Sequence, residues 1–424
     1  MRTPRTASEL TPFARWSIVG LLAAALFINY VDRGAVPTAA HLIQEELTLS
    51  AKQLGVLFSA FFWTYAILQI PIGWVAERYG AQRVLAVGLG LWACATMLVG
   101  FAHSFAALLL LRLLLGIGES AGFPSASKLL AVSVPIESLG LANGIVAFAY
   151  QFGPAVGAYC GGLIMVHYGW RATFWIFGAL SLLWLLPWSR VRLPHALAES
   201  PEAAAPPMRA ILRQPSLWGT ALGLFSTNYV FYFVLTWLPY YVVRERGFST
   251  AEMATLTGSA YLVSALTSII AGWAIDRCVL AGRATIAYKS VMVVAHLGTV
   301  GCMLGIAFAS QPWALAAIFT YQVITGAASA GVFAIPQILA GPAASARWVG
   351  VQNCCGNLAG VIAPALTGLL VEETHRFTAA FVSAAAVSLA GLVGWVWMVP
   401  RLAPLAWSTQ GSATAPEPAT IALK

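Results

Sequence analysis

Four ionisable residues lie inside apolar stretches of the sequence. Asp32 and Arg33 are adjacent at the end of "WSIVGLLAAALFINYVDR", and Arg112 and Glu119 lie seven residues apart in a second apolar stretch. Seven residues of helix make about two turns, which places Arg112 and Glu119 about 20° from the same face and roughly 10 Å apart along the axis. Each charge costs about 2.5–3.5 kcal/mol at the bilayer centre, so all four would cost on the order of 10 kcal/mol against lipid. We therefore expect them to face a cavity or one another.

These residue types could bind an anion and a proton. Arginine presents a planar fork that binds a carboxylate through two hydrogen bonds and stays charged at all relevant pH values. A carboxylic acid in a poorly hydrated cavity can take up a proton near physiological pH. A static ion-pair network is the alternative, but ionisable residues within membrane spans by default mark substrate or proton pathways. The pattern therefore predicts proton sites at Asp32 and Glu119 and an anion site at Arg33 and Arg112, with Lys128 as either an anchor or a helper.

The composition indicates an integral membrane protein. Of 424 residues, 59% are hydrophobic and only 9% are charged, whereas soluble domains average about 25% charged residues. The net charge of +8 comes from residues in loops between apolar spans, which argues against nucleic-acid binding. The six cysteines show no metal or disulfide spacing, and no HExxH or GxSxG motif occurs. We expect no cofactor, no metal and no enzymatic activity.

The apolar stretches predict an all-α fold of twelve transmembrane helices, since a span needs roughly 20 apolar residues. A stretch rich in proline and charge divides them into two bundles of six. The expected segments are a cytoplasmic N-terminal segment 1–15, a first bundle 16–191, a cytoplasmic linker 192–214, a second bundle 215–399 and a disordered cytoplasmic tail 400–424. The expected spans are 16–40, 53–76, 82–102, 105–132, 138–165, 171–191, 215–242, 252–275, 288–309, 313–340, 347–371 and 377–399.

The distribution of lysine and arginine predicts the orientation. Fifteen of these residues fall on the side of the N-terminus and five on the other side, with three inside spans. Cytoplasmic loops carry an excess of lysine and arginine. We therefore expect both termini in the cytoplasm. The N-terminus lacks the pattern of a secretory signal, so we expect the first helix to remain in the mature protein.

The two halves are related by an internal repeat. "GWVAER" at 73–78 closes the second predicted helix and "GWAIDR" at 272–277 closes the eighth, at a constant offset of 199 residues. A second repeated spacing places Asn143 eleven residues before Pro154 and Asn353 eleven residues before Pro364. Two parallel six-helix repeats are the layout of transporters that rock about a central site.

The stretch "GWVAERYGAQR" (73–83) resembles the loop signature of the major facilitator superfamily. The alternative interpretation is an ordinary positively charged loop, but the repeat copy keeps the glycine, the acid and the arginine. Within the stretch, Gly73 permits close helix approach, and Arg78 and Arg83 are expected to neutralise Glu77. The resemblance implies a cluster that latches the cytoplasmic face in one state. The residues predicted for this gate are Gly73, Glu77, Arg78, Arg83, Asp276 and Arg277.

Nearly the whole chain, about 14–400, resembles the anion:cation symporter family of that superfamily, which includes bacterial sugar-acid transporters. The motifs that carry the resemblance are "NYVDR" (29–33), "RLLLGIGESAGFPSASK" (112–128), "NYVFYFVLTWLPYYV" (228–242) and "GVQNCCGNLAG" (350–360). The resemblance implies a multi-pass protein of the bacterial inner membrane. It also implies protonating carboxylates at Asp32 and Glu119, and arginines at Arg33 and Arg112, one contacting substrate and the other near Glu119.

Further substrate contacts are expected in the cavity. The resemblance matches Tyr30 to a cavity tyrosine, and Asn353 or Asn357 to a polar contact in the eleventh helix. The remaining candidates are Tyr65, Gln151, Tyr229, Tyr232, Trp237 and Gln337. Gln151 is the main polar side chain of the fifth helix apart from tyrosines, which leaves open whether the substrate is a sugar acid or a less hydroxylated carboxylate.

The resulting hypothesis is proton-coupled import of a small organic anion by alternating access. In this scheme, protonation of Glu119 frees Arg112, and protonation of Asp32 leaves Arg33 to the substrate. The alternatives are a proton-coupled antiporter that exports a small molecule, a membrane-embedded enzyme, and a receptor that has lost transport. We expect the partners to be a small organic anion, a proton and the lipid bilayer, with no nucleic acid, and we expect a monomer.

Overall fold

The computed structural model describes residues 10–49, 51–191, 206–248, 250–374, 376–399 and 401–407. These residues are almost entirely helical, and no strand occurs among them, which confirms the predicted all-α fold. In chain order the elements are α1 (Pro12–Glu46), α2 (Ala51–Tyr79), α3 (Ala81–Val99), α4 (Phe105–Glu119), α5 (Gly122–Ser133), η2 (Ile136–Ser138), α6 (Leu139–Leu183), α7 (Leu185–Ser189), α9 (Met208–Leu212), α10 (Pro215–Arg244), α11 (Thr250–Leu280), α12 (Ala284–Phe308), α13 (Gln311–Val332), α14 (Ala334–Thr374), α15 (Thr378–Val393) and η4 (Gly394–Met398).

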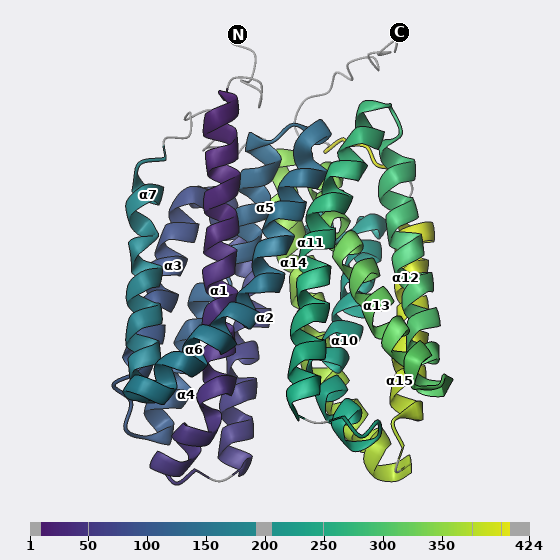
Figure 1. Ribbon diagram of the computed structural model, residues 1–424. Helices are drawn as coiled ribbons and strands as arrows, with labels where there is room; N and C mark the ends of the chain where they lie inside the picture. Colours follow the sequence, from purple (N-terminus) through teal and green to yellow (C-terminus); the bar gives the residue numbers. More distant parts are fainter. Residues whose placement is uncertain are drawn as a thin grey trace, which may run out of the picture.

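The helices form two bundles that stand side by side (Figure 1). The first bundle, purple to teal in the figure, contains α1 to α7, and the second, green to yellow, contains α10 to η4. α1 begins at the upper end of the view, where α2 and α11 end. We call this the motif end, because it holds the two repeat copies at 73–83 and 272–277.

Within the part of the chain that the structure describes, eleven apolar helical stretches are long enough to cross a membrane. One of them, Gln311–Val371, has 61 residues, or about 90 Å of helix against a bilayer core of about 30 Å. It contains a break at Gly341, where φ is 64° and ψ is 179°. Glycine adopts a positive φ readily because it has no β-carbon. The stretch therefore holds two crossings, and the prediction of twelve spans is confirmed.

Large apolar side chains lie exposed on the surfaces of both bundles. In water such a surface would be strongly unfavourable, whereas lipid tails are as apolar as leucine. Val87 of the first bundle, for example, is 72% exposed, and Ile270 of the second is 63% exposed. The exposure therefore agrees with the spans predicted from composition.

Two segment boundaries differ from the sequence prediction. α1 begins at Pro12, because the Thr11 hydroxyl caps the helix by accepting a hydrogen bond from the N–H of Ala14 (3.2 Å). The helix therefore starts inside the predicted segment 1–15. The predicted linker 192–214 contains α9, which is anchored by the fully buried Ile211. Its residues 192–205 lie outside the described chain.

Residues 401–407, at the start of the segment predicted to be a disordered tail, pack on the second bundle. The indole N–H of Trp407 donates to the carbonyl of Ala340 (3.0 Å), and Leu402 is buried. Carbonyls at the end of a helix lack partners within the helix, and apolar side chains gain stability on burial. Both effects order this short segment. The rest of the tail lies outside the described residues.

Candidate transport site and gate

Arg33 and Glu119 form a buried ion pair in the first bundle. Nε of Arg33, on α1, donates to Oε2 of Glu119, the last residue of α4, at 2.7 Å. The Glu119 side chain is 0% exposed and that of Arg33 is 14% exposed. Opposite charges are tolerated away from water when they are bonded to each other, whereas removing one partner is strongly destabilising. The pair therefore holds two of the predicted site residues in one place.

The rest of the Arg33 guanidinium is surrounded by aromatic rings. Its central carbon lies 4.5 Å from the ring centre of Tyr30, 4.8 Å from that of Phe61 and 4.3 Å from that of Tyr65. Nη2 is buried and has no hydrogen-bond partner among the described residues. An unsatisfied buried donor costs about 1–3 kcal/mol, and more when it is charged. The arrangement thus leaves one edge of the guanidinium available to an anion.

Arg112 is not the direct partner of Glu119 that we expected. Its Nε donates to the carbonyl of Leu57 on α2 (3.1 Å), and its guanidinium lies 5.3 Å from the ring centre of Phe61. The two-turn spacing separates Arg112 and Glu119 by roughly 10 Å along the helix. The carbonyl of Leu57 on α2 is therefore the nearer partner for Arg112. Arg112 lines the same cluster, but the cation bonded to Glu119 is Arg33.

Asp32 faces away from its neighbour Arg33. It is 2% exposed and accepts hydrogen bonds from Thr96 on α3 (3.5 Å) and Ser181 on α6 (3.3 Å). Adjacent residues on a helix point about 100° apart, so Asp32 and Arg33 contact different neighbours. The predicted release of Arg33 by protonation of Asp32 therefore does not rest on a direct contact between these two side chains.

The second bundle contributes neutral polar groups. The hydroxyl of Tyr232 on α10 donates to Oδ1 of Asn357 (3.0 Å), and Nδ2 of Asn357 donates to the carbonyl of Asn353 (2.8 Å). Nδ2 of Asn353 is buried without a partner among the described residues. The ring of Tyr232 meets Phe62 of the first bundle at 5.9 Å, and Phe62 contacts Phe61 beside Arg33. Ring contacts thus connect these amides with the charged cluster.

Tyr229 and Trp237, also predicted as substrate contacts, point elsewhere in the second bundle. The Tyr229 hydroxyl lies 3.4 Å from that of Ser383 on α15. Nε1 of Trp237 donates to the carbonyl of Pro364 (3.2 Å), and its ring packs near Phe377. The structure does not bring these two side chains to Arg33.

Gln151 and Gln337 connect the two bundles rather than lining the charged cluster. Nε2 of Gln151 donates to Ser329 (3.3 Å), and its oxygen accepts from Ser264, both in the second bundle. Gln337 exchanges two hydrogen bonds with Asn143 across the same interface, at 2.8 and 3.3 Å. Both glutamines are occupied by protein partners in this state.

At the motif end, Glu77 joins the first bundle to the second. It accepts a hydrogen bond from the backbone N–H of Arg347 (3.0 Å) and forms an ion pair with the guanidinium of the same residue. Gly73 lies so close to α14 that a β-carbon there would sit 2.6 Å from the carbonyl oxygen of Ala346. The close approach predicted for Gly73 is therefore present, and it is an approach between bundles.

The repeat copy makes the reciprocal contact. Asp276 accepts from the backbone N–H groups of Gly140 and Leu141, each at 2.8 Å. These two residues begin α6 of the first bundle, where unpaired N–H groups and the helix dipole attract a carboxylate. Lys128 adds a third link by donating to the carbonyl of Pro342 (2.5 Å). The motif end is closed in this structure.

The arginines of the motif play different parts from those expected. Arg78 lies over the ring of Trp74 (5.5 Å), Arg277 lies over that of Trp273 (5.2 Å), and Arg83 is exposed. The cation bonded to Glu77 is Arg347, which lies on α14 of the opposite bundle and outside both copies of the motif.

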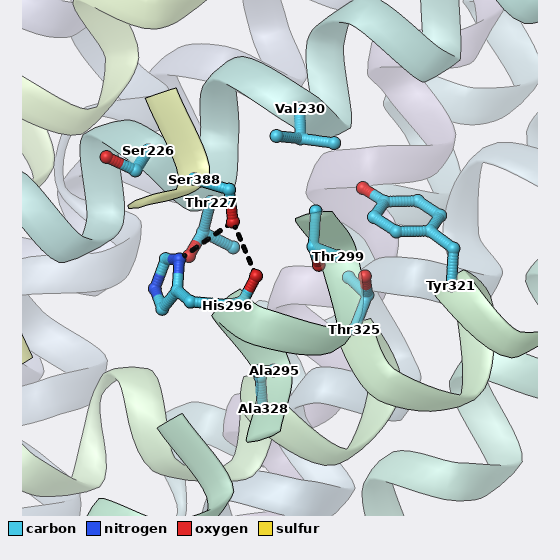
Figure 2. A pocket seen from close by; sticks show the side chains of 10 residues that line it. All are labelled: Ser226, Thr227, Val230, Ala295, His296, Thr299, Tyr321, Thr325, Ala328 and Ser388. Atoms are coloured by element: carbon cyan, nitrogen blue, oxygen red, sulfur yellow. Dashed lines mark hydrogen bonds between the residues drawn. The ribbon is translucent and has the colours of Figure 1, made fainter. Parts of the chain in front are cut away.

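The second bundle also holds a small polar chamber (Figure 2). The chamber has a volume of about 20 Å³ and could hold about one water molecule. Ser388 donates its hydroxyl hydrogen to the carbonyl of His296 (3.1 Å), so its oxygen accepts from Nδ1 of the His296 ring (3.2 Å). Residues lining the chamber include Ser226, Thr227, Thr299, Tyr321 and Thr325. The sequence reasoning had not selected His296.

Comparisons with known proteins agree with this architecture. The sequence profile of the Major Facilitator Superfamily matches residues 22–364. The chain is 30% identical to the "Probable sulfoacetate transporter SauU" of Cupriavidus necator, over 92% of this chain and 94% of that protein. It is 29% identical to the hexuronate transporter of Bacillus subtilis, over 88% and 92% of the two chains.

Solved structures show the same fold at low sequence identity. The proton:xylose symporter XylE superposes with a TM-score of 0.78 at 14% identity, covering 93% of this chain and 98% of that one. The fucose:proton symporter FucP of E. coli gives a TM-score of 0.75 at 16% identity, covering 91% and 99%.

The fold and the site define a multi-pass membrane transporter rather than an enzyme. The chain belongs to the Major Facilitator Superfamily, and its relatives match the anion:cation symporter family within it.

Proposed function

We propose that this protein imports a small organic anion together with protons by alternating access. The observation that carries the proposal is the Arg33–Glu119 pair, in which Arg33 bonds the acid through Nε while its Nη2 has no partner among the described residues. A bound carboxylate and the Glu119 carboxylate would then compete for one guanidinium. Proton uptake by Glu119 weakens its hold on Arg33, and the anion takes its place. Proton binding and anion binding therefore favour each other.

The membrane potential opposes the import of an anion, and coupling to protons would overcome this cost. Moving a monoanion into a negative interior costs about 2.3 kcal/mol per 100 mV. One co-transported proton cancels this electrical cost, and a second makes the potential favourable. Glu119 is the proposed first proton site, and Asp32, buried on the other side of α1, is the proposed second site.

The proposed orientation places the motif end and both termini in the cytoplasm of a bacterial cell, with the protein in the inner membrane. The excess of lysine and arginine at this end supports the assignment. The closed motif end then belongs to a state that shuts the site off from the cytoplasm, and rocking of the bundles would break the Glu77 and Asp276 contacts. Both bundles of one chain contribute to the site, so we propose a functional monomer.

Purified protein in liposomes tests the proposal. Glu119→Gln should lose uphill uptake driven by a proton gradient while still exchanging substrate across the membrane, because the neutral side chain mimics the protonated acid. Glu373→Gln, at an exposed position on α14, serves as the matched control and should behave like wild type.

Concentration of substrate by Glu119→Gln under a proton gradient would remove Glu119 from the coupling site. The direction of flux in the same liposomes separates import from export. A symporter takes up substrate when the outside is acidic, whereas an antiporter expels it under the same gradient.

A further inference from the structure

Eight aromatic side chains form a chain of contacts that includes Arg33, three of them packing against its guanidinium; we call this chain the aromatic collar. Successive ring centres lie 4.9–5.9 Å apart, and between Tyr30 and Tyr65 the chain passes through the Arg33 guanidinium. The members, in order of contact, are Phe333, Phe123, Tyr150, Tyr30, Tyr65, Phe61, Phe62 and Tyr232.

The collar spans both bundles. Its two ends, Phe333 and Tyr232, belong to the second bundle, and the six rings between them belong to the first. Four rings in the collar are only half-buried, as is Arg33 itself, so part of each of these side chains is exposed. These four are Tyr30, Phe62, Tyr150 and Tyr232. A molecule bound to the free edge of Arg33 would therefore contact ring faces on several sides.

The amide groups predicted as substrate contacts are largely occupied. Gln151 and Gln337 bond across the bundle interface, and Asn357 bonds Tyr232 and Asn353. Of the four amides predicted as substrate contacts, Asn353 alone keeps a buried nitrogen without a partner among the described residues. A hydroxylated ring would bring several hydroxyl groups, and each one left unpaired on binding costs affinity.

We infer that the substrate is an aromatic monocarboxylate, or another organic anion with a flat apolar body, rather than a polyhydroxylated sugar acid. The inference rests on the proposed function and specifies its substrate class. Arg33 binds the anionic group, and the collar binds the body by stacking. Aromatic pairs prefer offset or edge-to-face contact and gain binding energy beyond that of area alone.

Three acids that share a carboxylate and a six-membered ring test the inference: benzoate, cyclohexanecarboxylate and glucuronate. Binding is measured as a substrate-dependent thermal shift of the purified protein, and uptake is measured in liposomes with an acidic exterior. Benzoate should bind at least about tenfold more tightly than glucuronate and up to about tenfold more tightly than cyclohexanecarboxylate. Glucuronate binding as tightly as benzoate would overturn the inference.

A matched pair of substitutions tests the collar itself. Tyr30→Phe keeps the ring and should retain the preference for benzoate over cyclohexanecarboxylate, whereas Tyr30→Leu should lose it. Phe101→Leu, at a ring that is 59% exposed on the outer surface, is the control for the same loss of a ring and should keep the preference. A preference that survives in Tyr30→Leu would also overturn the inference. If this variant fails to fold, the comparison of the three acids on wild type decides.

The two proposals fail in different ways. Proton-driven uptake of glucuronate without uptake of benzoate would sustain symport and refute the aromatic substrate. Uptake of benzoate that does not respond to a proton gradient would sustain the aromatic site and refute the coupling. No binding of any of the three acids would refute the aromatic substrate.

Discussion

The two bundles are alike at the motif end and different in their interiors. At the motif end each bundle supplies an acid that accepts from the backbone of the other bundle: Glu77 accepts the N–H of Arg347 on α14, and Asp276 accepts two N–H groups at the start of α6. In the interior, the first bundle carries the Arg33–Glu119 pair, whereas the described interior polar contacts of the second are made by neutral groups such as Tyr232 and Asn357.

This difference separates two tasks. Closing a gate between two bundles needs matching contacts on both sides, so the repeat keeps them. Coupling a proton to an anion needs one arginine for which an acid and a substrate compete, and a second charged cluster would add the cost of burying more ions. The neutral bundle can then supply surface that fits the body of the substrate.

The largest effect is expected from Arg33→Ala, which removes the cation on which the difference between the bundles depends. Breaking a buried pair costs about 3–5 kcal/mol of stability. Because the variant also lacks the cation proposed to bind the anion, transport should fall by at least about 100-fold. Uptake and carboxylate binding in liposomes measure the loss, and a melting curve shows whether the variant is folded. Arg33→Lys keeps the charge without the fork and should retain part of the binding. Unchanged affinity in Arg33→Ala would place the anion elsewhere.

A smaller effect is expected at the gate, where Glu77→Gln tests how alike the two motif copies are. Glu77 bonds a guanidinium as well as an N–H group, and hydrogen bonds to charged groups contribute about 1.5–3 kcal/mol. Its loss should shift the equilibrium toward an open motif end by about tenfold or more. Distances between spin labels at the exposed positions Arg83 and Arg283, one in each bundle, report the opening.

Asp276→Asn is the matched substitution in the other copy. The amide oxygen still accepts from a helix N–H, so we expect less opening than in Glu77→Gln. Equal opening in the two variants would show that the Arg347 guanidinium contributes nothing beyond its backbone N–H.

A change in stability without loss of coupling is expected from His296→Leu in the neutral bundle. The substitution removes the hydrogen bond that Nδ1–H of His296 donates to the Ser388 hydroxyl. We expect this loss to lower the free energy of unfolding by about 1–3 kcal/mol. Ser388→Ala breaks the same contact and should give a similar drop in melting temperature. If His296→Leu binds substrate normally but loses proton-driven uptake, the second bundle also carries a coupling group and the comparison fails.

The smallest effect is expected at the end opposite the motif, where the pair of Glu46 and Arg171 stays within the first bundle. The indole N–H of Trp170, which donates at 2.6 Å, and Arg171 lower the pKa of Glu46 below its ordinary value of 4.5. Because the folded pKa is the lower one, the stabilisation is present above pH 4.5 and is lost as the pH falls through the folded pKa.

Glu46 is 47% exposed, so solvent screening keeps its contribution below about 1 kcal/mol. Melting temperatures recorded from pH 6 down to about pH 3 should fall slightly less steeply for Glu46→Gln than for wild type. Glu373→Gln again serves as the control, and parallel curves for wild type and Glu46→Gln would contradict the prediction.

Much of this protein could be predicted from the sequence. Hydrophobic length predicts twelve spans, because the bilayer requires about 20 apolar residues for each crossing. The four charges inside the spans stand out because lipid excludes ions. The repeat of "GWVAER" and "GWAIDR" indicates the gate, since Gly73 and the acid at each copy lie at a fixed offset of 199 residues.

The partners of these residues were decided only by the tertiary structure. Helical spacing places Arg112 and Glu119 on one face, but it does not say that Arg33 of α1 lies closer to Glu119. A long side chain bonds to whichever partner lies within a few ångströms. That partner depends on how each helix is rotated and shifted against the next. Arg347 as the partner of Glu77 is a second case, because it comes from the opposite bundle, 270 residues away along the chain.

The aromatic collar is the clearest case of all. Its rings come from α1, α2, α5, α6 and α10, with Phe333 between α13 and α14. In the sequence they are indistinguishable from packing aromatics, since each helix of a membrane bundle carries several. Only the assembled bundles bring them into one chain of contacts that includes a single guanidinium, because ring contacts depend on distances between helices that no local pattern specifies.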